Sequence, residues 1–270
     1  MQVVLITGGS SGIGKATGEL LQSNGYAVIG TSRSPDHYTD HPFPLIQMDL
    51  HDAISIQKAV ESVVSQYGAI HVLVNNAGKG IAGPIEETPL DEIRSVFETN
   101  LVGATAVIQS VIPVMRTQNE GKIVNITSIA GYSGLPFRAV YSATKSALHM
   151  LTESLRLELK PTNIQCCTLA PGDVATNISH SRYHVPVKKN SPYHAIYGAV
   201  RNDMDVHVND GVSAKTVAIS INRIIKKNKL YLIEDTCESL GSKFDKKYLG
   251  TFGDFGTYSF YYSHQITSGE

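Results

Sequence analysis

The chain contains no tryptophan and only three cysteines among its 270 residues. Cys166 and Cys167 are adjacent within an apolar run, and the third is Cys237. This spacing fits neither a disulfide framework nor a tetrahedral zinc site, so we expect a reduced environment and no bound metal. We interpret all three cysteines as packing residues.

The sequence also lacks an excess of charge, with 23 basic and 24 acidic residues and a net charge of −1. Proteins that bind nucleic acids or membrane surfaces usually carry a basic excess, so neither partner is predicted. No apolar run is expected to approach membrane-spanning length, and the amino terminus enters a predicted strand without a signal-peptide pattern. We therefore expect a cytoplasmic location.

What the chain does contain is an alternation of short apolar runs and amphipathic segments. Strands are predicted near residues 2–7, 26–31, 43–48, 70–74, 121–127, 163–169 and 229–233. Helices are predicted over 12–24, 52–67, 89–117, 140–160 and 212–227, with Pro113 kinking or ending the third of them. This alternation is typical of a single α/β domain with a doubly wound parallel sheet, the Rossmann type.

A glycine-rich turn joins the first predicted strand to the first predicted helix. It reads Thr7-Gly8-Gly9-Ser10-Ser11-Gly12-Ile13-Gly14, with the spacing G-x-x-x-G-x-G rather than G-x-G-x-x-G. Free backbone amides and the helix dipole at such a turn favour a pyrophosphate. The turn therefore predicts a dinucleotide site.

Acid–base chemistry is indicated by Ser128 and by the pair Tyr141 and Lys145. Positions i and i+4 lie on one face of a helix, so the phenol and the ammonium point the same way. The cation favours the phenolate, which helps a tyrosine exchange a proton with a substrate oxygen. Ser128 follows a predicted strand at the edge where open α/β sheets bind ligands. For either piece taken alone, a surface helix pair or a helix cap is the favoured interpretation, and the combination with the glycine turn reverses this preference.

Together these motifs resemble the short-chain dehydrogenases/reductases over residues 1 to about 230. The matching residues, in family order, are residues 7–14, Asp49-Leu50, Asn75-Asn76-Ala77-Gly78, Asn100, Ser128, Tyr141 with Lys145, and Pro171-Gly172. The resemblance implies a catalytic tetrad of Asn100, Ser128, Tyr141 and Lys145. It also implies that Lys145 binds the nicotinamide ribose and that Asn100 holds a water linking Lys145 to solvent.

The same resemblance implies which residues contact the cofactor. The glycine turn would contribute Gly8, Ser10, Ser11, Gly12, Ile13 and Gly14, and Asp49 with Leu50 would lie beside the adenine. Asn76, Ala77 and Gly78 would pack near the adenosine half, and Pro171 and Gly172 near the nicotinamide. The family's substrate lid corresponds to residues 173–210.

The choice of cofactor is predicted from the end of the second strand. Arg33 stands there in place of an acidic residue that would bond the ribose hydroxyls of NAD. An arginine can bind the 2′-phosphate of NADP, so NADP(H) is the predicted cofactor. A solvated surface arginine is the alternative.

The last forty residues depart from this family. Residues 231–241 and 250–260 resemble the sugar-nucleotide aminotransferases and dehydrases that use pyridoxal phosphate. That resemblance implies that Asp235 pairs with the pyridinium nitrogen, that Ser259 lies near the phosphate, and that His264 replaces the Schiff-base lysine. So short a segment cannot build its own core. We therefore expect a dehydrogenase domain over residues 1–233 and an aminotransferase-like fragment over 234–270.

The sequence thus predicts an oxidoreductase that transfers a hydride between NADP(H) and a ketone or alcohol, with Tyr141 as general acid and base. The family resemblance implies a homodimer formed through the helices near 89–117 and 140–160. Ile129, Tyr132, Leu135 and Phe137 hint at an apolar substrate pocket beside Ser128. Two alternatives stay open: a nucleotide-binding protein without turnover, and a fusion product of a deoxysugar pathway.

Overall fold

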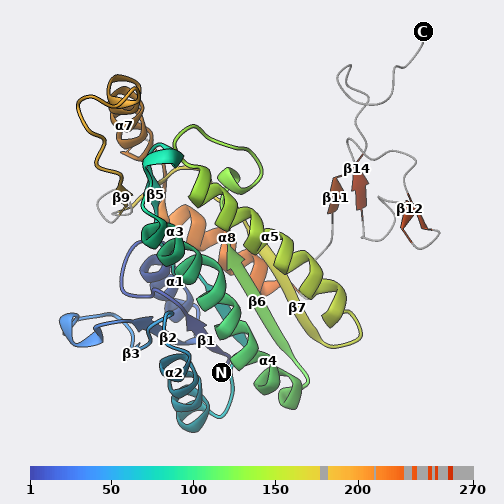
Figure 1. Cartoon of the computed structure of the whole chain (residues 1–270). Coiled ribbons are helices and arrows are strands. Elements are labelled where there is room, and N and C mark those ends of the chain that lie inside the picture. Colours follow the sequence, from blue (N-terminus) through green and yellow to red (C-terminus); the bar gives the residue numbers. More distant parts are fainter. Residues whose placement is uncertain are drawn as a thin grey trace. The chain divides into compact units, whose positions relative to one another are not determined.

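The computed structural model describes residues 1–176, 182–209 and 211–227, and the short segments 233–235, 243–244, 247–248 and 255–257 (Figure 1). The contacts divide the chain into two compact units, Met1–Lys226 and Lys227–Glu270. All the residues predicted for the dehydrogenase site belong to the first unit.

The first unit is built on a six-stranded parallel sheet in the order β3-β2-β1-β4-β6-β7. The strands are β1 (Val3–Ile6), β2 (Ala27–Ser32), β3 (Leu45–Gln47), β4 (Val72–Asn75), β6 (Gly121–Ile126) and β7 (Ile164–Leu169). Strand order reverses between β1 and β4, which makes their carboxyl ends the expected ligand site. The predicted doubly wound parallel sheet is therefore confirmed.

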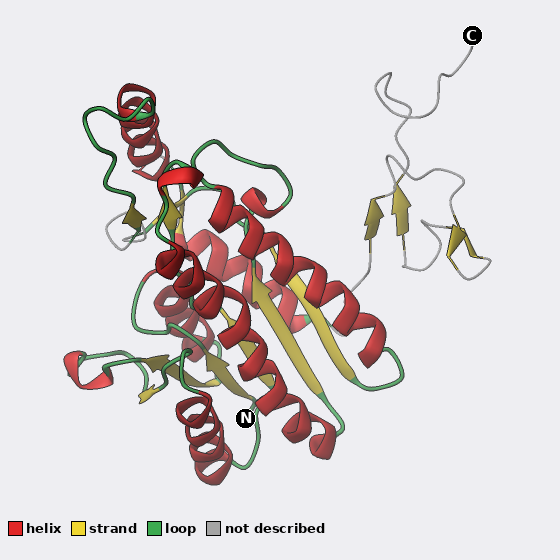
Figure 2. Ribbon diagram, viewed as in Figure 1, coloured by secondary structure: helices red, strands yellow, loops and turns green. Residues whose placement is uncertain are grey.

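Helices cover both faces of this sheet (Figure 2). On β1, Val3 and Leu5 belong to one core and Val4 and Ile6 to the other, because successive strand side chains alternate between faces. The first core lies against α2 (Ala53–Tyr67), α4 (Ala104–Gln118) and α5 (Ala139–Leu159). The second lies against α1 (Gly12–Ser23) and α8 (Ala214–Lys226). Two buried faces explain why strands such as β1 and β4 are apolar at nearly every position.

One long helical run joins α3 (Leu90–Phe97), a π-helical stretch (Glu98–Gly103) and α4. Contrary to the sequence expectation, Leu90–Gln118 is long and apolar enough to cross a membrane, with a mean hydropathy of 1.2. Its side chains Val107, Val111 and Met115 are buried in the first core, which accounts for much of this apolar character. Pro113 does not end the helix, since α4 continues to Gln118 and Pro113 lies on its exposed side.

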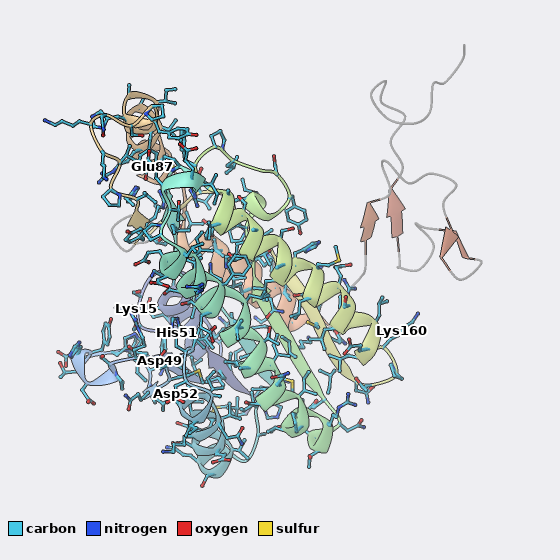
Figure 3. All side chains as sticks on the ribbon, in the orientation of Figure 1. Lys15, Asp49, His51, Asp52, Glu87 and Lys160 are labelled. Atoms are coloured by element: carbon cyan, nitrogen blue, oxygen red, sulfur yellow. The ribbon has the colours of Figure 1, made fainter. Side chains whose placement is uncertain are left out.

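Small elements cover the carboxyl edge of the sheet. β5 (Ile81–Ala82) pairs with β9 (Tyr183–His184), and β8 (Val174–Ala175) pairs with β10 (Val212–Ser213). Helix α7 (His194–Asn209) lies beyond the carboxyl ends of the strands. Glu87, which Figure 3 labels, accepts a hydrogen bond from the Ser191 hydroxyl. This bond holds the chain before α7 to the short helix Ile85–Glu87. The sequence missed α7 because its apolar residues follow no clear helical period.

In the second unit, β11 (Ile233–Asp235) pairs in parallel with β14 (Phe255–Thr257), and β12 (Lys243–Phe244) pairs with β13 (Lys247–Tyr248). Of the predicted strand over residues 229–233, the described residue Ile233 begins β11 and pairs with Phe255. Residues 229–232, Cys237, Ser259 and His264 lie outside the described residues. The predicted boundary at residue 233 stays a prediction.

Candidate active site

A cavity of about 780 Å³ opens where the carboxyl ends of the strands meet. Its size is within the range of small-molecule and cofactor sites. Most of the predicted cofactor residues line it: Gly8, Ser10, Ser11, Gly12, Ile13, Arg33, Asp49, Leu50, Asn76, Ala77, Gly78, Tyr141, Lys145, Pro171 and Gly172. Ser128 lines it as well, whereas Gly14 and Asn100 do not.

The glycine turn has the backbone that an anion cradle needs. Gly8 and Gly12 have φ values of +63° and +52°, in the region that favours glycine. A Cβ on Gly14 would lie 2.2 Å from the Gly8 carbonyl oxygen, so Gly14 lets α1 begin close against the turn. The Ser11 side chain does not cap α1, and no acidic residue lies in its first turn. The amides and dipole of α1 therefore remain available for a cofactor pyrophosphate.

Asn76 ties this turn to the end of β4. Its side-chain amide donates to the carbonyl oxygens of Thr7 and Gly8, at 3.0 and 3.1 Å. The backbone amides of Asn76 and Ala77 both donate to the Thr7 hydroxyl, at 3.0 and 3.1 Å. Asn76 is thus more than part of a turn, because it fixes the shape of the glycine cradle.

Arg33 follows β2 at another part of the cavity wall. Its side chain is exposed, and within the described part of the chain it has no ion pair. Ser32, Ser34 and His37 line the cavity beside it. Asp49 and His51, labelled in Figure 3, line it from the segment after β3, where the Asp49 carboxylate accepts from the His51 amide at 3.0 Å. The Arg33 guanidinium is therefore free to meet an anion.

Tyr141 and Lys145 lie one turn apart near the start of α5. The Lys145 ammonium is buried, donates to the Ile126 carbonyl oxygen at 2.8 Å, and lies 5.9 Å from the centroid of the Tyr141 ring. Burial lowers the pKa of Lys145, and the nearby Tyr141 phenol partly opposes this change. The arrangement places a buried cation beside the phenol, as the helical spacing predicts.

Ser128 lies at the end of β6. Its hydroxyl oxygen accepts from the Ala130 amide at 3.2 Å and so caps the short helix Ile129–Gly131. The cap role and the site role are compatible, because Ser128 also lines the cavity and its hydroxyl can still donate.

Asn100 lies in the π-helical stretch and is buried. Its side-chain oxygen accepts from the Lys79 amide at 2.7 Å, and its nitrogen donates to the Lys79 carbonyl and the Thr144 hydroxyl at 3.0 and 3.1 Å. A Cβ on Gly78 would lie 3.3 Å from the Asn100 oxygen and 3.6 Å from the Lys145 ammonium. Asn100 thus joins the segment after β4 to α5 beside Lys145. Its role in a water relay stays a prediction.

The expected apolar pocket is wrong. Ile129, Tyr132 and Leu135 are exposed, and the Phe137 ring packs at 5.2 Å from that of Tyr197. None of the four is among the residues that line the cavity, although Ile129 Cδ1 would lie 3.5 Å from a Cβ on the cavity-lining Gly172. The residues that do line it near Tyr141 are polar: Arg138, Asp173 and Arg182. Arg138 could have been found from its position three residues before Tyr141 on the same helix face; Arg182 has no comparable sequence signal.

Comparisons with known proteins identify the family. The short chain dehydrogenase family model matches residues 2–185, so the chain belongs to the short-chain dehydrogenase family. It is 40% identical over 181 residues to a 3-ketodihydrosphingosine reductase from Bacteroides thetaiotaomicron, covering 67% of each chain. A Burkholderia phymatum short-chain dehydrogenase/reductase in complex with NAD has a TM-score of 0.73 at 27% identity, over 84% of this chain and 86% of that one. The structure of ElxO with NADP bound has a TM-score of 0.70 at 26% identity, over 85% of this chain and 94% of that one.

A second family model, the DegT/DnrJ/EryC1/StrS aminotransferase family, matches residues 204–270. This match overlaps α8, yet Val217, Ala218 and Ile221 of that helix are buried in the first unit. We assign α8 to the dehydrogenase fold on the basis of this packing.

Proposed function

We propose that the protein is an NADP(H)-dependent carbonyl reductase in which Tyr141 exchanges the proton. The observation that carries the proposal is the shared cavity, which brings Ser128, Tyr141 and Lys145 to the same space as the glycine cradle. The 3-ketodihydrosphingosine reductase among the relatives supports a carbonyl group as the reacting centre.

The residues of the chain would divide the reaction as follows. A bound nicotinamide supplies the hydride that reaches the carbonyl carbon. Tyr141 gives its phenolic proton to the carbonyl oxygen, which becomes the hydroxyl of the product alcohol. Ser128 donates a hydrogen bond to that oxygen, and the Lys145 ammonium stabilises the phenolate that remains. Reprotonation of Tyr141 from solvent, through the region of Asn100, restores the starting state.

NADP(H) is favoured over NAD(H) by the surroundings of Arg33. The cavity wall there is formed by Arg33 with Ser32, Ser34 and His37, and a guanidinium can hold a phosphate with two parallel hydrogen bonds. Structural relatives occur with either NAD or NADP bound, so the preference for NADP(H) is inferred from this chain's own residues.

The activity is tested by following the oxidation of NADPH and NADH by the full chain with a panel of ketones. The panel includes 3-ketodihydrosphingosine, simple aliphatic ketones, and oxo acids with their esters. We expect turnover with NADPH and a lower kcat/KM with NADH. Tight NADPH binding without turnover of any ketone or alcohol would favour the alternative of a nucleotide-binding protein.

The quaternary state is proposed to be a homodimer formed through α4 and α5. Val102, Met150 and Leu157 are exposed apolar residues on this helical layer, as expected for a face that is buried on assembly. Light scattering at micromolar concentration tests this, with Leu157→Glu expected to shift the mass toward the monomer. A wild-type monomer would refute it. A cytoplasmic location likewise remains a proposal.

A further inference from the structure

Two arginines line the cavity next to Tyr141. The Arg138 guanidinium lies 4.7 Å above the centroid of the Tyr141 ring. Arg182, from the segment before β9, is only 7% exposed although it carries a charge. Neither residue belongs to the tetrad or to the glycine cradle, so the proposed proton transfer leaves both without a role.

The backbone holds Arg138 in place. It is the N-cap of α5, and the preceding Phe137 has a φ of +59°, which is unusual for a bulky residue. The Phe137 carbonyl accepts from the Gly83 amide at 2.9 Å, and its ring packs against Tyr197 of α7. A strained residue fixed from two sides is a feature that clusters at ligand sites.

The fold also makes room for Arg182. Gly80 lies opposite it, and a Cβ on Gly80 would be 3.2 Å from the Arg182 Cγ. The Tyr183 amide donates to the Gly80 carbonyl at 3.0 Å, which fixes the strand that follows Arg182. The side chain is therefore held against the β5 segment while its head reaches the cavity.

Within the described residues, neither guanidinium has a charged acceptor. In the described residues, each donates from Nη1 to the same thioether, Met204 Sδ, at 3.8 Å for Arg138 and 3.7 Å for Arg182. The Nε of each is buried and has no hydrogen-bond partner among the residues that the structure describes. Asp173 lines the same cavity, but no carboxylate in the described part of the chain lies within 4.0 Å of either guanidinium. A thioether is a weak acceptor and carries no negative charge.

The local charge is consequently unbalanced. Burial lowers the pKa of Arg138, and the neighbouring Arg182 lowers it further, while Tyr141 and Asp173 act in the opposite direction. A guanidinium stays protonated even so. An anionic ligand would fill the empty donor sites and reduce the repulsion between the two arginines.

We infer that the substrate carries a carboxylate or phosphate group, which Arg138 and Arg182 bind while its carbonyl faces Tyr141. This inference rests on the proposed function and specifies its substrate class. Both anions present a planar or near-planar pair of oxygens that matches the guanidinium fork. The anion would orient the carbonyl relative to Tyr141.

The test compares matched substrates in the full chain with NADPH. Acetoacetate and longer 3-oxo carboxylates are compared with their methyl esters, and dihydroxyacetone phosphate with dihydroxyacetone. We expect the kcat/KM of the wild type to be higher for the 3-oxo carboxylates than for their methyl esters, or higher for dihydroxyacetone phosphate than for dihydroxyacetone. The loss of a hydrogen bond to a charged group predicts that Arg182→Met or Arg138→Met reduces this preference by about 10- to 100-fold. Arg182→Lys should give an intermediate loss, because the charge remains but the fork is lost.

Arg116→Met, an exposed change on α4, is the matched control and should keep the preference. Equal kcat/KM for anions and neutral partners in the wild type would overturn the inference, as would an unchanged ratio in folded arginine variants. A loss of NADPH affinity in the arginine variants equal to the loss in kcat/KM would instead assign the pair to the cofactor.

A binding measurement separates this inference from the proposed activity. Malonate and inorganic phosphate are titrated against the full chain in the presence of NADPH, with Arg182→Met and Arg182→Lys in parallel. Arginine-dependent binding without turnover of any ketone would support the anion site and contradict the reductase. Turnover of a ketone without arginine-dependent anion binding would support the reductase and contradict the anion site.

Discussion

The Lys145 ammonium donates a 2.8 Å hydrogen bond to the carbonyl oxygen of Ile126. Ile126 ends β6, two residues before Ser128, so this bond locks the helix that carries Tyr141 to the strand that carries Ser128. The buried cation is therefore both a chemical group of the site and a connection between its two halves.

Lys145→Met should reduce NADPH affinity and turnover together, because the cation beside the phenol is lost.

The effect of Lys145→Met on stability should depend on pH. Burial lowers the pKa of Lys145 below its ordinary 10.5, so between the two values the unfolded chain binds more protons and wild-type stability rises with pH. The variant lacks this rise. The free energy of unfolding of the cofactor-free wild type, relative to that of Lys145→Met, should therefore increase as the pH rises toward 10.5. A difference that does not change with pH would contradict the assignment.

Arg33→Asp should shift preference from NADPH toward NADH. A carboxylate repels the 2′-phosphate of NADP and can accept bonds from the ribose diol of NAD. The predicted loss is about 1.5–3 kcal/mol in NADPH binding, the usual value of a hydrogen bond to a charged group. Titration of both cofactors measures it, with Arg223→Asp on the exposed side of α8 as the control. Equal NADPH affinity before and after the change would show that Arg33 is only a surface residue.

Gly14→Ala should weaken cofactor binding and lower stability. The new methyl group would lie 2.2 Å from the Gly8 carbonyl and 2.6 Å from the Asn76 amide nitrogen, so the cradle must open. Overpacking of this kind typically costs about 1–3 kcal/mol. Gly134→Ala is the control, because nothing lies within 4 Å of its Cβ position. Thermal unfolding and NADPH titration compare the two, and equal effects would mean that the close approach of α1 is not required.

Much of the fold could be predicted from the sequence because strands such as β1 and β4 are apolar and buried on both faces. Amphipathic helical segments follow most of the strands and mark where one strand ends and the next begins. The glycine turn, Tyr141 and Lys145 were equally accessible, since their spacing alone defines a shared face or a strand-to-helix turn. The turn lies within one strand-to-helix unit and the Tyr141–Lys145 pair within one helix, where local geometry determines side-chain direction.

Other features depend on contacts between distant segments. Arg182 and Gly80 are brought together by the pairing of β5 with β9, and no sequence pattern near either residue predicts this pairing. The apolar pocket expected from Ile129 and Tyr132 failed because both side chains are exposed, and nearness to Ser128 in sequence does not determine that direction. Pro113, predicted to kink or end the helix, does not end it, because the exposed side of α4 tolerates the missing backbone hydrogen bond.

A chain that ends after Ile233 should keep the fold and any NADPH-dependent activity. Both apolar cores lie within Met1–Lys226, so no described core residue would be removed. Circular dichroism and NADPH titration of the shortened and full chains measure the effect. Loss of folding in the shortened chain would mean that residues 234–270 are an integral part of the protein, contrary to the proposed domain division.

The most direct test of the account is Tyr141→Phe, measured with the best ketone from the panel. The change removes only the transferable proton, so we expect kcat to fall by about 10²- to 10⁴-fold, the usual contribution of general acid catalysis. NADPH affinity should change little, because the ring and its contacts remain. Ser142→Ala, a neighbouring change on the same helix, is the control for local packing. A Tyr141→Phe protein that bound NADPH and kept most of the wild-type kcat would contradict the assignment of Tyr141 as the proton donor.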